Sequence, residues 1–250
     1  MSDFKIRTLL VTGSNRGIGL EFVQQFVKSP NPPDQIFAAC RDPDAPRSQE
    51  LKNLAEKHSN VVVIQLDATD GASITESAKQ VEKHLNGRGL DLLINNAGVL
   101  HPNTLQTQTA EDMMEVYSVN VVGPMLVTQA YYDLLKKSAA SNGKAAIFNV
   151  SSLLGSIEHV PGVFADFPVI SYRCSKAALN MLSRCQGEGY KQDNIISVAV
   201  HPGWVQTDLG GERAPLTTET SVVGMLKVIY SLTMDQSGTF VDWEEKAVKW

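Results

Sequence analysis

The stretch Thr12-Gly13-Ser14-Asn15-Arg16-Gly17-Ile18-Gly19 decides the fold class of this chain. It follows an apolar, strand-like run at residues 6–12 and opens a run with helical periodicity at residues 18–28. Glycines let the backbone approach a pyrophosphate closely, and a helix N-terminus offers free N–H groups and the positive end of its dipole to an anion. The stretch therefore predicts a phosphate-binding turn after the first strand. The alternative is a tight turn whose glycines serve packing alone.

The rest of the chain continues this alternation of strand-like and helix-like segments. Runs rich in Val, Ile and Leu predict seven strands, at residues 6–12, 35–40, 61–66, 90–95, 145–150, 195–200 and 239–243. Apolar residues at spacings of three and four predict helices at residues 18–28, 48–57, 73–85, 111–137, 170–190 and 220–232. Such alternation is typical of βαβ units. We therefore expect an α/β fold: a single-domain, doubly wound parallel sheet of the Rossmann type, with about seven strands and helices on both faces.

Two long stretches without predicted strands or helices, residues 153–169 and 201–219, interrupt this pattern. Long loops in a compact domain usually shape a functional site, so we expect both to border a substrate. No repeat, low-complexity tract or linker divides the chain. Residues 1–250 are therefore expected to form one domain.

Composition and charge exclude several classes of protein. Apolar residues make up 43% and charged residues 20% of the chain, which is typical of a globular protein and excludes disorder. The 22 basic residues are scattered and outnumbered by 27 acidic ones, which argues against a nucleic-acid partner. Residues 1–7 hold no apolar signal core, and no apolar run approaches the roughly 18 residues of a membrane span. We expect a cytoplasmic protein without a membrane partner. The three cysteines form no C-x-x-C pair, which predicts reduced thiols and no metal site.

Two Y-x-x-x-K patterns offer a candidate acid–base group: Tyr172 with Lys176, and Tyr132 with Lys136. Residues four apart share a helix face, and a nearby ammonium lowers the pKa of a phenol. Ligands of open α/β sheets bind at the carboxyl ends of the strands, where the following helices begin. Tyr172 stands near the start of its predicted helix, whereas Tyr132 lies more than 20 residues into its own. We therefore expect Tyr172 and Lys176 at the active site and a structural role for Tyr132.

Six motifs, in order along the chain, resemble those of the short-chain dehydrogenase/reductase family. They are the T-G-x-x-x-G-x-G turn at residues 12–19, Asn95-Asn96-Ala97-Gly98, Asn120, Asn149-Val150-Ser151-Ser152, Tyr172-Arg173-Cys174-Ser175-Lys176 and Pro202-Gly203. The resemblance runs nearly the whole chain. Residues 202–208 and 239–250 are most similar to carbonyl reductases of the sniffer and C-factor type.

This resemblance implies an NADP-dependent oxidoreductase that reduces carbonyl groups. Tyr172 would protonate the carbonyl oxygen, Ser152 would hydrogen-bond it, Lys176 would hold the nicotinamide ribose, and Asn120 would join a water relay to Lys176. The residues implied to bind NADP(H) are Gly13, Ser14, Asn15, Arg16, Gly17, Ile18, Gly19, Arg41, Asp67, Ala68, Asn95, Ala97, Gly98, Tyr172, Lys176, Pro202, Gly203, Val205 and Thr207. The expected substrate is a small or medium apolar ketone, aldehyde or quinone. The alternative is an NADP-binding regulatory or scaffold protein whose catalytic set is vestigial.

The end of the second predicted strand favours NADPH over NADH. An NAD-selective fold places an acidic side chain there, and that carboxylate repels a 2′-phosphate. Here the strand ends in Cys40 and Arg41 follows, while Arg16 faces the adenosine ribose by family analogy. Two guanidiniums would then contact the phosphate. Asp42 is the competing feature, because a small backbone shift would bring its carboxylate to the ribose.

Three further expectations concern the surroundings of this site. His201 stands at a strand end without a G-x-S-x-G elbow elsewhere, so we expect a core or turn residue rather than part of a hydrolase triad. Trp204, Phe164 and Phe167 either line an apolar substrate wall or pack in the core. By family analogy, the helices at residues 111–137 and 170–190 would pair in a homodimer.

Overall fold

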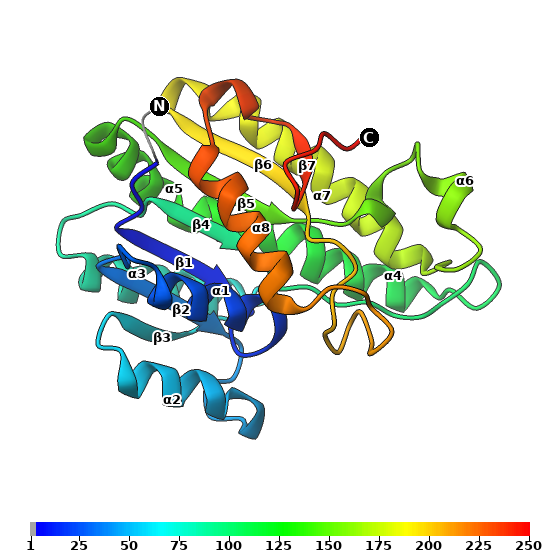
Figure 1. Cartoon of the computed structure of the whole chain (residues 1–250), viewed down its shortest axis with the longest axis horizontal. Helices are drawn as coiled ribbons and strands as arrows, with labels where there is room; N and C mark the ends of the chain where they lie inside the picture. The colour runs from blue at the N-terminus through cyan, green and yellow to red at the C-terminus, as the bar shows by residue number, and fades with distance from the viewer. Residues whose placement is uncertain (1–3) are drawn as a thin grey trace.

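The computed structural model describes residues 4–250, and its centre is a seven-stranded sheet in the order β3-β2-β1-β4-β5-β6-β7 (Figure 1). Residues 1–3, which belong to the N-terminal segment 1–7 that lacks an apolar signal core, lie outside the described part. The strands are β1 (Thr8–Thr12), β2 (Gln35–Cys40), β3 (Val61–Gln65), β4 (Leu92–Asn95), β5 (Ala145–Val150), β6 (Ile195–His201) and β7 (Phe240–Asp242). All seven predicted strands are present. Every neighbouring pair is parallel, because a helical crossover returns the chain to the same edge each time.

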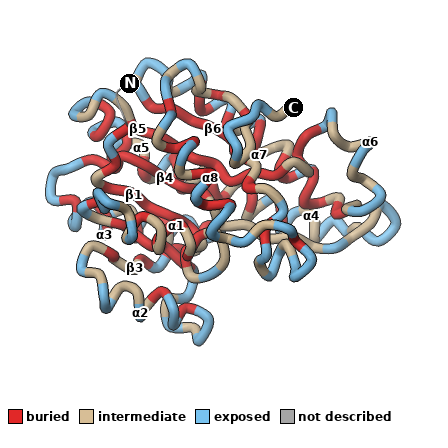
Figure 2. Tube along the Cα trace, in the orientation of Figure 1, coloured by how far each residue is buried: buried red, intermediate tan, exposed pale blue. Residues whose placement is uncertain are grey.

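Helices cover both faces of the sheet. They are α1 (Gly17–Lys28), α2 (Gln49–Lys57), α3 (Gly71–Leu85), α4 (Ala110–Tyr117), α5 (Gly123–Asn142), α6 (Val160–Val163), α7 (Ile170–Gly189) and α8 (Thr218–Ser231). Leu9 and Val11 of β1 join a core with α1, α2 and α8, whereas Leu10 joins a second core with α3 and α5. Side chains of successive strand residues thus pack into the cores on opposite faces of the sheet, and Figure 2 shows that the strands consist largely of buried residues. The predicted fold class, a single-domain doubly wound sheet, is confirmed.

One predicted helix, residues 111–137, is divided by a π-helical turn at Ser118–Val122. The N–H of Gly123 donates to the carbonyl of Ser118, five residues back, instead of four. Pro124 follows at the start of α5, and a proline lacks an N–H and clashes with the carbonyl four residues before it. The wider turn accommodates that proline and places Asn120 within it. The helix begins as predicted, since the Oγ1 of Thr109 caps it by accepting the N–H of Asp112 at 3.1 Å.

The order of the strands reverses between β1 and β4, since β2 and β3 lie to one side of β1 and β4 to β7 lie to the other. Ligands of such sheets bind at this reversal, beyond the carboxyl ends of the strands. Both long loops emerge at the same edge, where α6 and the segment before α8 lie beyond the strand ends in Figure 1. Among the described helices, none combines the length and apolar character that crossing a membrane requires.

Candidate active site

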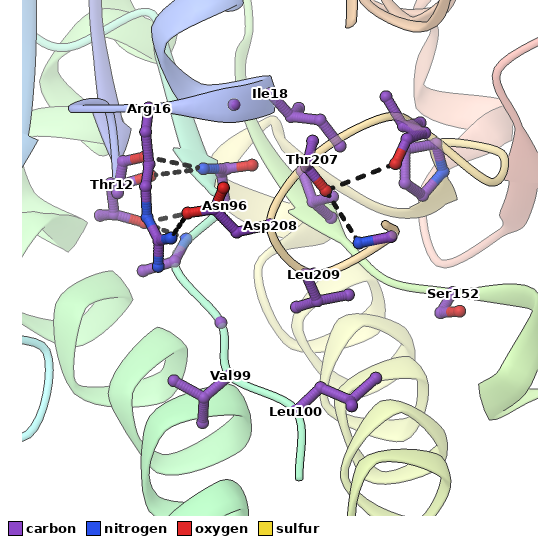
Figure 3. Close-up of a pocket in the computed structure, with 18 of the residues that line it drawn as sticks. Thr12, Arg16, Ile18, Asn96, Val99, Leu100, Ser152, Thr207, Asp208 and Leu209 are labelled. Carbon is purple, nitrogen blue, oxygen red and sulfur yellow. Dashed lines mark hydrogen bonds and ion pairs between the residues drawn. The ribbon is translucent and has the colours of Figure 1, made fainter. Parts of the chain in front are cut away.

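A cavity of about 830 Å³ lies at this carboxyl edge. Its walls come from the glycine turn after β1, the ends of β4 and β5, the start of α7 and the segment after β6 (Figure 3). Both long loops contribute, the first through Leu153, Leu154, Val163 and Phe167, and the second through every residue from His201 to Gly210. The cavity therefore joins segments that are far apart in the sequence.

The glycine turn is fastened to the end of β4. The Nδ2 of Asn96 donates to the carbonyls of Thr12 at 3.0 Å and Gly13 at 3.2 Å, as Figure 3 shows. The Oγ1 of Thr12 accepts the N–H groups of Asn96 and Ala97. Gly13 has φ +65°, and a Cβ there would lie 2.9 Å from the Cα of Ala97. The turn thus presents bare backbone at the start of α1, which fits the pyrophosphate of a dinucleotide.

Most residues predicted to bind the cofactor line the cavity. They are Gly13, Asn15, Arg16, Gly17, Ile18, Arg41, Asp67, Ala68, Ala97, Gly98, Tyr172, Lys176, Pro202, Gly203, Val205 and Thr207. Three predicted cofactor residues do not line it: Ser14, Gly19 and Asn95.

Each of these three is held by packing or by hydrogen bonds behind the cavity. The buried Ser14 donates its Oγ–H to the carbonyl of Ala39 at 3.0 Å. A Cβ on Gly19 would lie 2.2 Å from the carbonyl oxygen of Gly13, so this glycine permits the close contact of helix and turn. Asn95 donates to the Oδ1 of Asn149 at 2.9 Å, inside the molecule. A cofactor contact of the Asn95 side chain does not fit this placement, and the neighbouring Asn96 is the asparagine on the cavity.

The serine, tyrosine and lysine of the predicted catalytic set meet on one wall of the cavity. Ser152 follows β5, and Tyr172 and Lys176 lie in the first turns of α7. The Oγ of Ser152 accepts the N–H of Leu154 at 3.2 Å, and its interaction with the Tyr172 hydroxyl acts to lower the pKa of that tyrosine. The Nζ of Lys176 donates to the carbonyl of Val150 at 2.8 Å and lies 5.5 Å from the centre of the Tyr172 ring. All three side chains are buried, so the wall is preorganised.

Asn120, the fourth predicted catalytic residue, lies behind this wall and does not line the cavity. Its amide both accepts the N–H of Val99 and donates to the carbonyl of Val99, each at 2.9 Å. It also donates to the Oγ of Ser175 at 2.9 Å. Asn120 therefore ties the segment after β4 to α7. Gly98 lies between this amide and Lys176, because a Cβ there would be 3.2 Å from the Oδ1 of Asn120 and 3.7 Å from the Nζ of Lys176.

Burial controls the protonation of the catalytic pair. It raises the pKa of Tyr172 to about 12, an effect that the hydrogen bond with Ser152 only partly offsets. It lowers the pKa of Lys176 to about 8, because desolvation disfavours the ammonium. Desolvation thus dominates, and the net pKa of Tyr172 lies above its ordinary value rather than below it. At pH 7 the tyrosine holds its proton and the lysine is mostly charged.

The second Y-x-x-x-K pattern has the predicted structural role. The hydroxyl of Tyr132 donates to Asp193, and the Nζ of Lys136 lies 3.0 Å from the same carboxylate. Tyr132 also packs against Tyr190, with the two ring centres 4.9 Å apart. These contacts join α5 to the turn before β6, away from the residues that line the cavity.

The side of the cavity beside Ser152 and Tyr172 is largely apolar. Phe167 and Trp204 line it with their rings edge to face, 5.2 Å between centres, whereas Phe164 does not line it. Val99, Leu100 and Leu209 were not predicted from the sequence, although the first two directly follow the Asn-Asn-Ala-Gly motif. His201 also lines the cavity, and desolvation lowers its pKa to about 4, which keeps the imidazole neutral at pH 7.

The opposite end of the cavity carries charged side chains. Arg16, Arg41 and Arg47 line it, and of these only Arg47 was not predicted. Arg16 forms an ion pair with Asp208. The Oδ1 of Asp42 accepts the N–H groups of Asp44 at 3.0 Å and Ala45 at 3.1 Å, so that carboxylate oxygen is bound to its own turn. Asp42, whose carboxylate would repel a 2′-phosphate if it faced the ribose, is thus held in its own turn.

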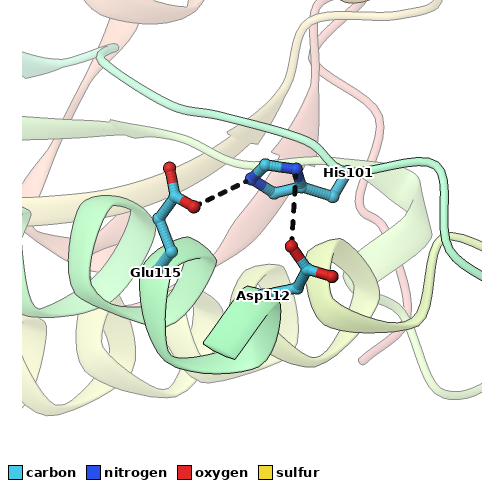
Figure 4. A group of neighbouring side chains, drawn as sticks. All are labelled: His101, Asp112 and Glu115. Carbon is cyan, nitrogen blue, oxygen red and sulfur yellow. Dashed lines mark ion pairs between the residues drawn. The ribbon is translucent and has the colours of Figure 1, made fainter. Parts of the chain in front are cut away.

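A second group of ionisable side chains, His101, Asp112 and Glu115, lies outside the cavity lining (Figure 4). The Nδ1 of His101 is 3.8 Å from Asp112, and its Nε2 is 3.4 Å from Glu115. The other oxygen of Asp112 accepts hydrogen bonds from Asn103 and Thr109. Each member could offer one ligand atom to a metal ion, but His101 already pairs with both carboxylates when its imidazole is protonated.

A doubly wound sheet with a glycine turn at its reversal point defines the class of dinucleotide-binding α/β proteins. The family model of short chain dehydrogenases matches residues 7–216, and the chain belongs to this family. The resemblance that the motifs indicate is therefore confirmed.

Solved structures and sequence relatives agree with this assignment. The NADPH-bound carbonyl reductase from chicken fatty liver is 49% identical, with a TM-score of 0.95 over 98% of this chain and 100% of that one. The carbonyl reductase Sniffer of Drosophila melanogaster is 33% identical, with a TM-score of 0.93 and the same coverage. An uncharacterized oxidoreductase of Schizosaccharomyces pombe is 32% identical over 94% of each chain.

Proposed function

We propose that this protein is an NADPH-dependent carbonyl reductase acting on small or medium apolar ketones, aldehydes or quinones. The observation that carries the proposal is the meeting of Ser152, Tyr172 and Lys176 on one cavity wall, with the glycine turn at one side and an apolar wall at the other. The similarity to an NADPH-bound carbonyl reductase at 49% identity supports it.

The chain offers a complete set of groups for NADP(H). The backbone of the glycine turn, from Gly13 to Ile18, would hold the pyrophosphate at the start of α1. Arg16 and Arg41 would contact the 2′-phosphate, and Lys176 would hydrogen-bond the nicotinamide ribose. Bound NADPH supplies the hydride that reduces the carbonyl carbon.

The residues on the wall supply the proton and orient the substrate. Because burial keeps Tyr172 protonated, its hydroxyl can donate a proton to the carbonyl oxygen as negative charge develops there. The Ser152 hydroxyl, which lines the cavity with Tyr172, would donate a second hydrogen bond to the same oxygen. The charged Lys176 lies beside the tyrosine ring and stabilises the phenolate left after transfer. Asn120 would connect to Lys176 through a water relay, and its hydrogen bonds to Val99 hold the segment after β4 next to Lys176.

The apolar lining supports the proposed substrate class. Leu100, Leu153, Val163, Phe167 and Trp204 line the cavity together with Ser152, and the charged side chain on this wall is that of Lys176, whose Nζ already donates to the carbonyl of Val150. A carboxylate or ammonium on the substrate would lose its hydration here without gaining a partner. Uncharged carbonyl compounds therefore fit the wall better than charged ones.

Several broader features belong to the same proposal. Residues 1–250 act as one domain, with loops 153–169 and 201–219 shaping the substrate site, and the protein works in the cytoplasm. A homodimer would form through α4, α5 and α7. Large apolar side chains exposed on two of these helices support it: Met114 and Tyr117 on α4, and Met181 on α7.

The experiment is a panel of apolar carbonyl compounds incubated with NADPH, followed at the absorbance of the reduced nicotinamide. We expect oxidation with wild type and its loss in Tyr172→Phe, which keeps the ring and removes the acid. NADPH that raises the melting temperature without turnover on any compound would instead favour the regulatory or scaffold alternative.

A further inference from the structure

Arg173, the residue after the proposed proton donor, is buried without a carboxylate in its hydrogen-bonding set. The residue is 7% exposed, and its Nε and Nη2 donate to the backbone carbonyls of Phe167 at 2.8 Å and Val163 at 3.0 Å. Its Nη1 is buried and has no hydrogen-bond partner among the described residues. Burial of a guanidinium in this way is unfavourable, and it lowers the pKa of Arg173. Such a group calls for an explanation other than stability.

The two carbonyls that Arg173 binds belong to cavity-lining residues of the first long loop. Val163 and Phe167 both line the cavity beside the proposed substrate position. Phe164, between them in sequence, lies against the guanidinium instead, with its ring centre 5.5 Å from the Arg173 Cζ. The planar guanidinium thus holds one turn of the loop at three points and turns its two outer residues toward the cavity.

This fixed loop also positions the second long loop. The ring of Phe167 meets that of Trp204 edge to face, and the indole Nε1 of Trp204 donates to the carbonyl of Gly210 at 2.7 Å. A continuous set of contacts therefore runs from Arg173 on α7 through Phe167 to Trp204. Arg173 on α7, the helix that carries Tyr172 and Lys176, contacts the first loop directly, and the second loop contacts the first through Phe167 and Trp204.

We propose that Arg173 is a positioning residue that sets the distance between the apolar wall and the catalytic tyrosine, and thereby determines how large a carbonyl compound is reduced. The inference rests on the proposed function. Arg173 itself does not line the cavity, so it acts through Val163 and Phe167 rather than by touching the substrate. A lysine would keep the charge but lacks the fork that reaches two carbonyls at once.

The test compares Arg173→Met and Arg173→Lys with Arg184→Met. Arg184 is a matched control, because it also lies on α7 and donates from its guanidinium to a backbone carbonyl, that of Gly238 at 2.9 Å, away from the cavity lining. Each variant is assayed with propanal and with the largest aromatic ketone that the wild type reduces. Arg173→Met should lower kcat/KM for the large ketone about tenfold or more, mainly through KM, and should change that for propanal less than about threefold. Arg173→Lys should fall between, and Arg184→Met should match wild type.

A second measurement reports on the loop without using activity. Backbone hydrogen exchange of residues 156–169 should quicken in Arg173→Met and remain as in wild type in Arg184→Met. Unchanged exchange together with unchanged selectivity would overturn the inference, as would an equal loss of kcat/KM for both substrates. If the wild type reduces no carbonyl compound, the proposed function fails, and the exchange measurement still decides whether Arg173 holds the loop.

Discussion

The preference for NADPH over NADH depends on Arg16 and Arg41, and the structure sets its size. A hydrogen bond to a charged group contributes about 1.5–3 kcal/mol when shielded from solvent. The side chain of Arg16 is 52% exposed and already pairs with Asp208, so its gain on binding a phosphate is smaller. We take about 1 kcal/mol for each arginine, which corresponds to a wild-type preference of about 30-fold in kcat/KM.

Three substitutions test this value with one carbonyl substrate and both cofactors. Arg16→Ala and Arg41→Ala should each lower the preference about fivefold, and the double variant should bring it near one. Asp208→Asn should raise the preference, because it frees Arg16 from a competing carboxylate. If the double variant keeps the wild-type preference, or if wild type uses NADH equally well, the assignment of these arginines is refuted.

Three other predictions follow from the catalytic wall and the exposed helix faces. Lys176→Met should lower kcat by about 100-fold or more and weaken NADPH binding, whereas Lys136→Met should change neither. Equal losses in both variants would contradict the structural role of Lys136, which pairs with Asp193. Because burial lowers the pKa of Lys176 from 10.5 to about 8, the unfolded chain binds more protons than the folded one between these values. The free energy of unfolding of wild type, measured with urea, should therefore rise relative to that of Lys176→Met from about pH 8 to pH 10.5, and a constant difference would show that the lysine titrates normally. Sedimentation at micromolar concentration should give a dimer that Met114→Glu with Met181→Glu converts to a monomer, and a wild-type monomer would reject the paired helices.

Sequence patterns predicted the sheet well because both of its faces are buried. The strands are short runs of Val, Ile and Leu, and the glycine turn, the two asparagine motifs and the Pro202-Gly203 turn each lie at or directly after the end of one of them. The interruption of the predicted helix 111–137 depends on Pro124, whose effect is local geometry rather than periodicity.

The differences between the predicted and the observed placement of site residues have similarly local causes. Asn95 and Asn96 are neighbours in one motif, and the orientation of each at the strand end decides which one reaches the cavity. The raised pKa of Tyr172 reflects burial by segments distant in sequence, which the spacing to Lys176 does not reveal. Arg47 belongs to none of the sequence motifs, and the path of the chain after the second strand brings it to the cavity.

The most direct test of the proposed function is the steady-state rate of NADPH oxidation with an apolar ketone, measured for wild type, Tyr172→Phe and Tyr132→Phe, with the alcohol product quantified. We expect wild type and Tyr132→Phe to turn over alike and Tyr172→Phe to lose about 100-fold or more in kcat. Comparable turnover in Tyr172→Phe and wild type would contradict the assignment of Tyr172 as the proton donor.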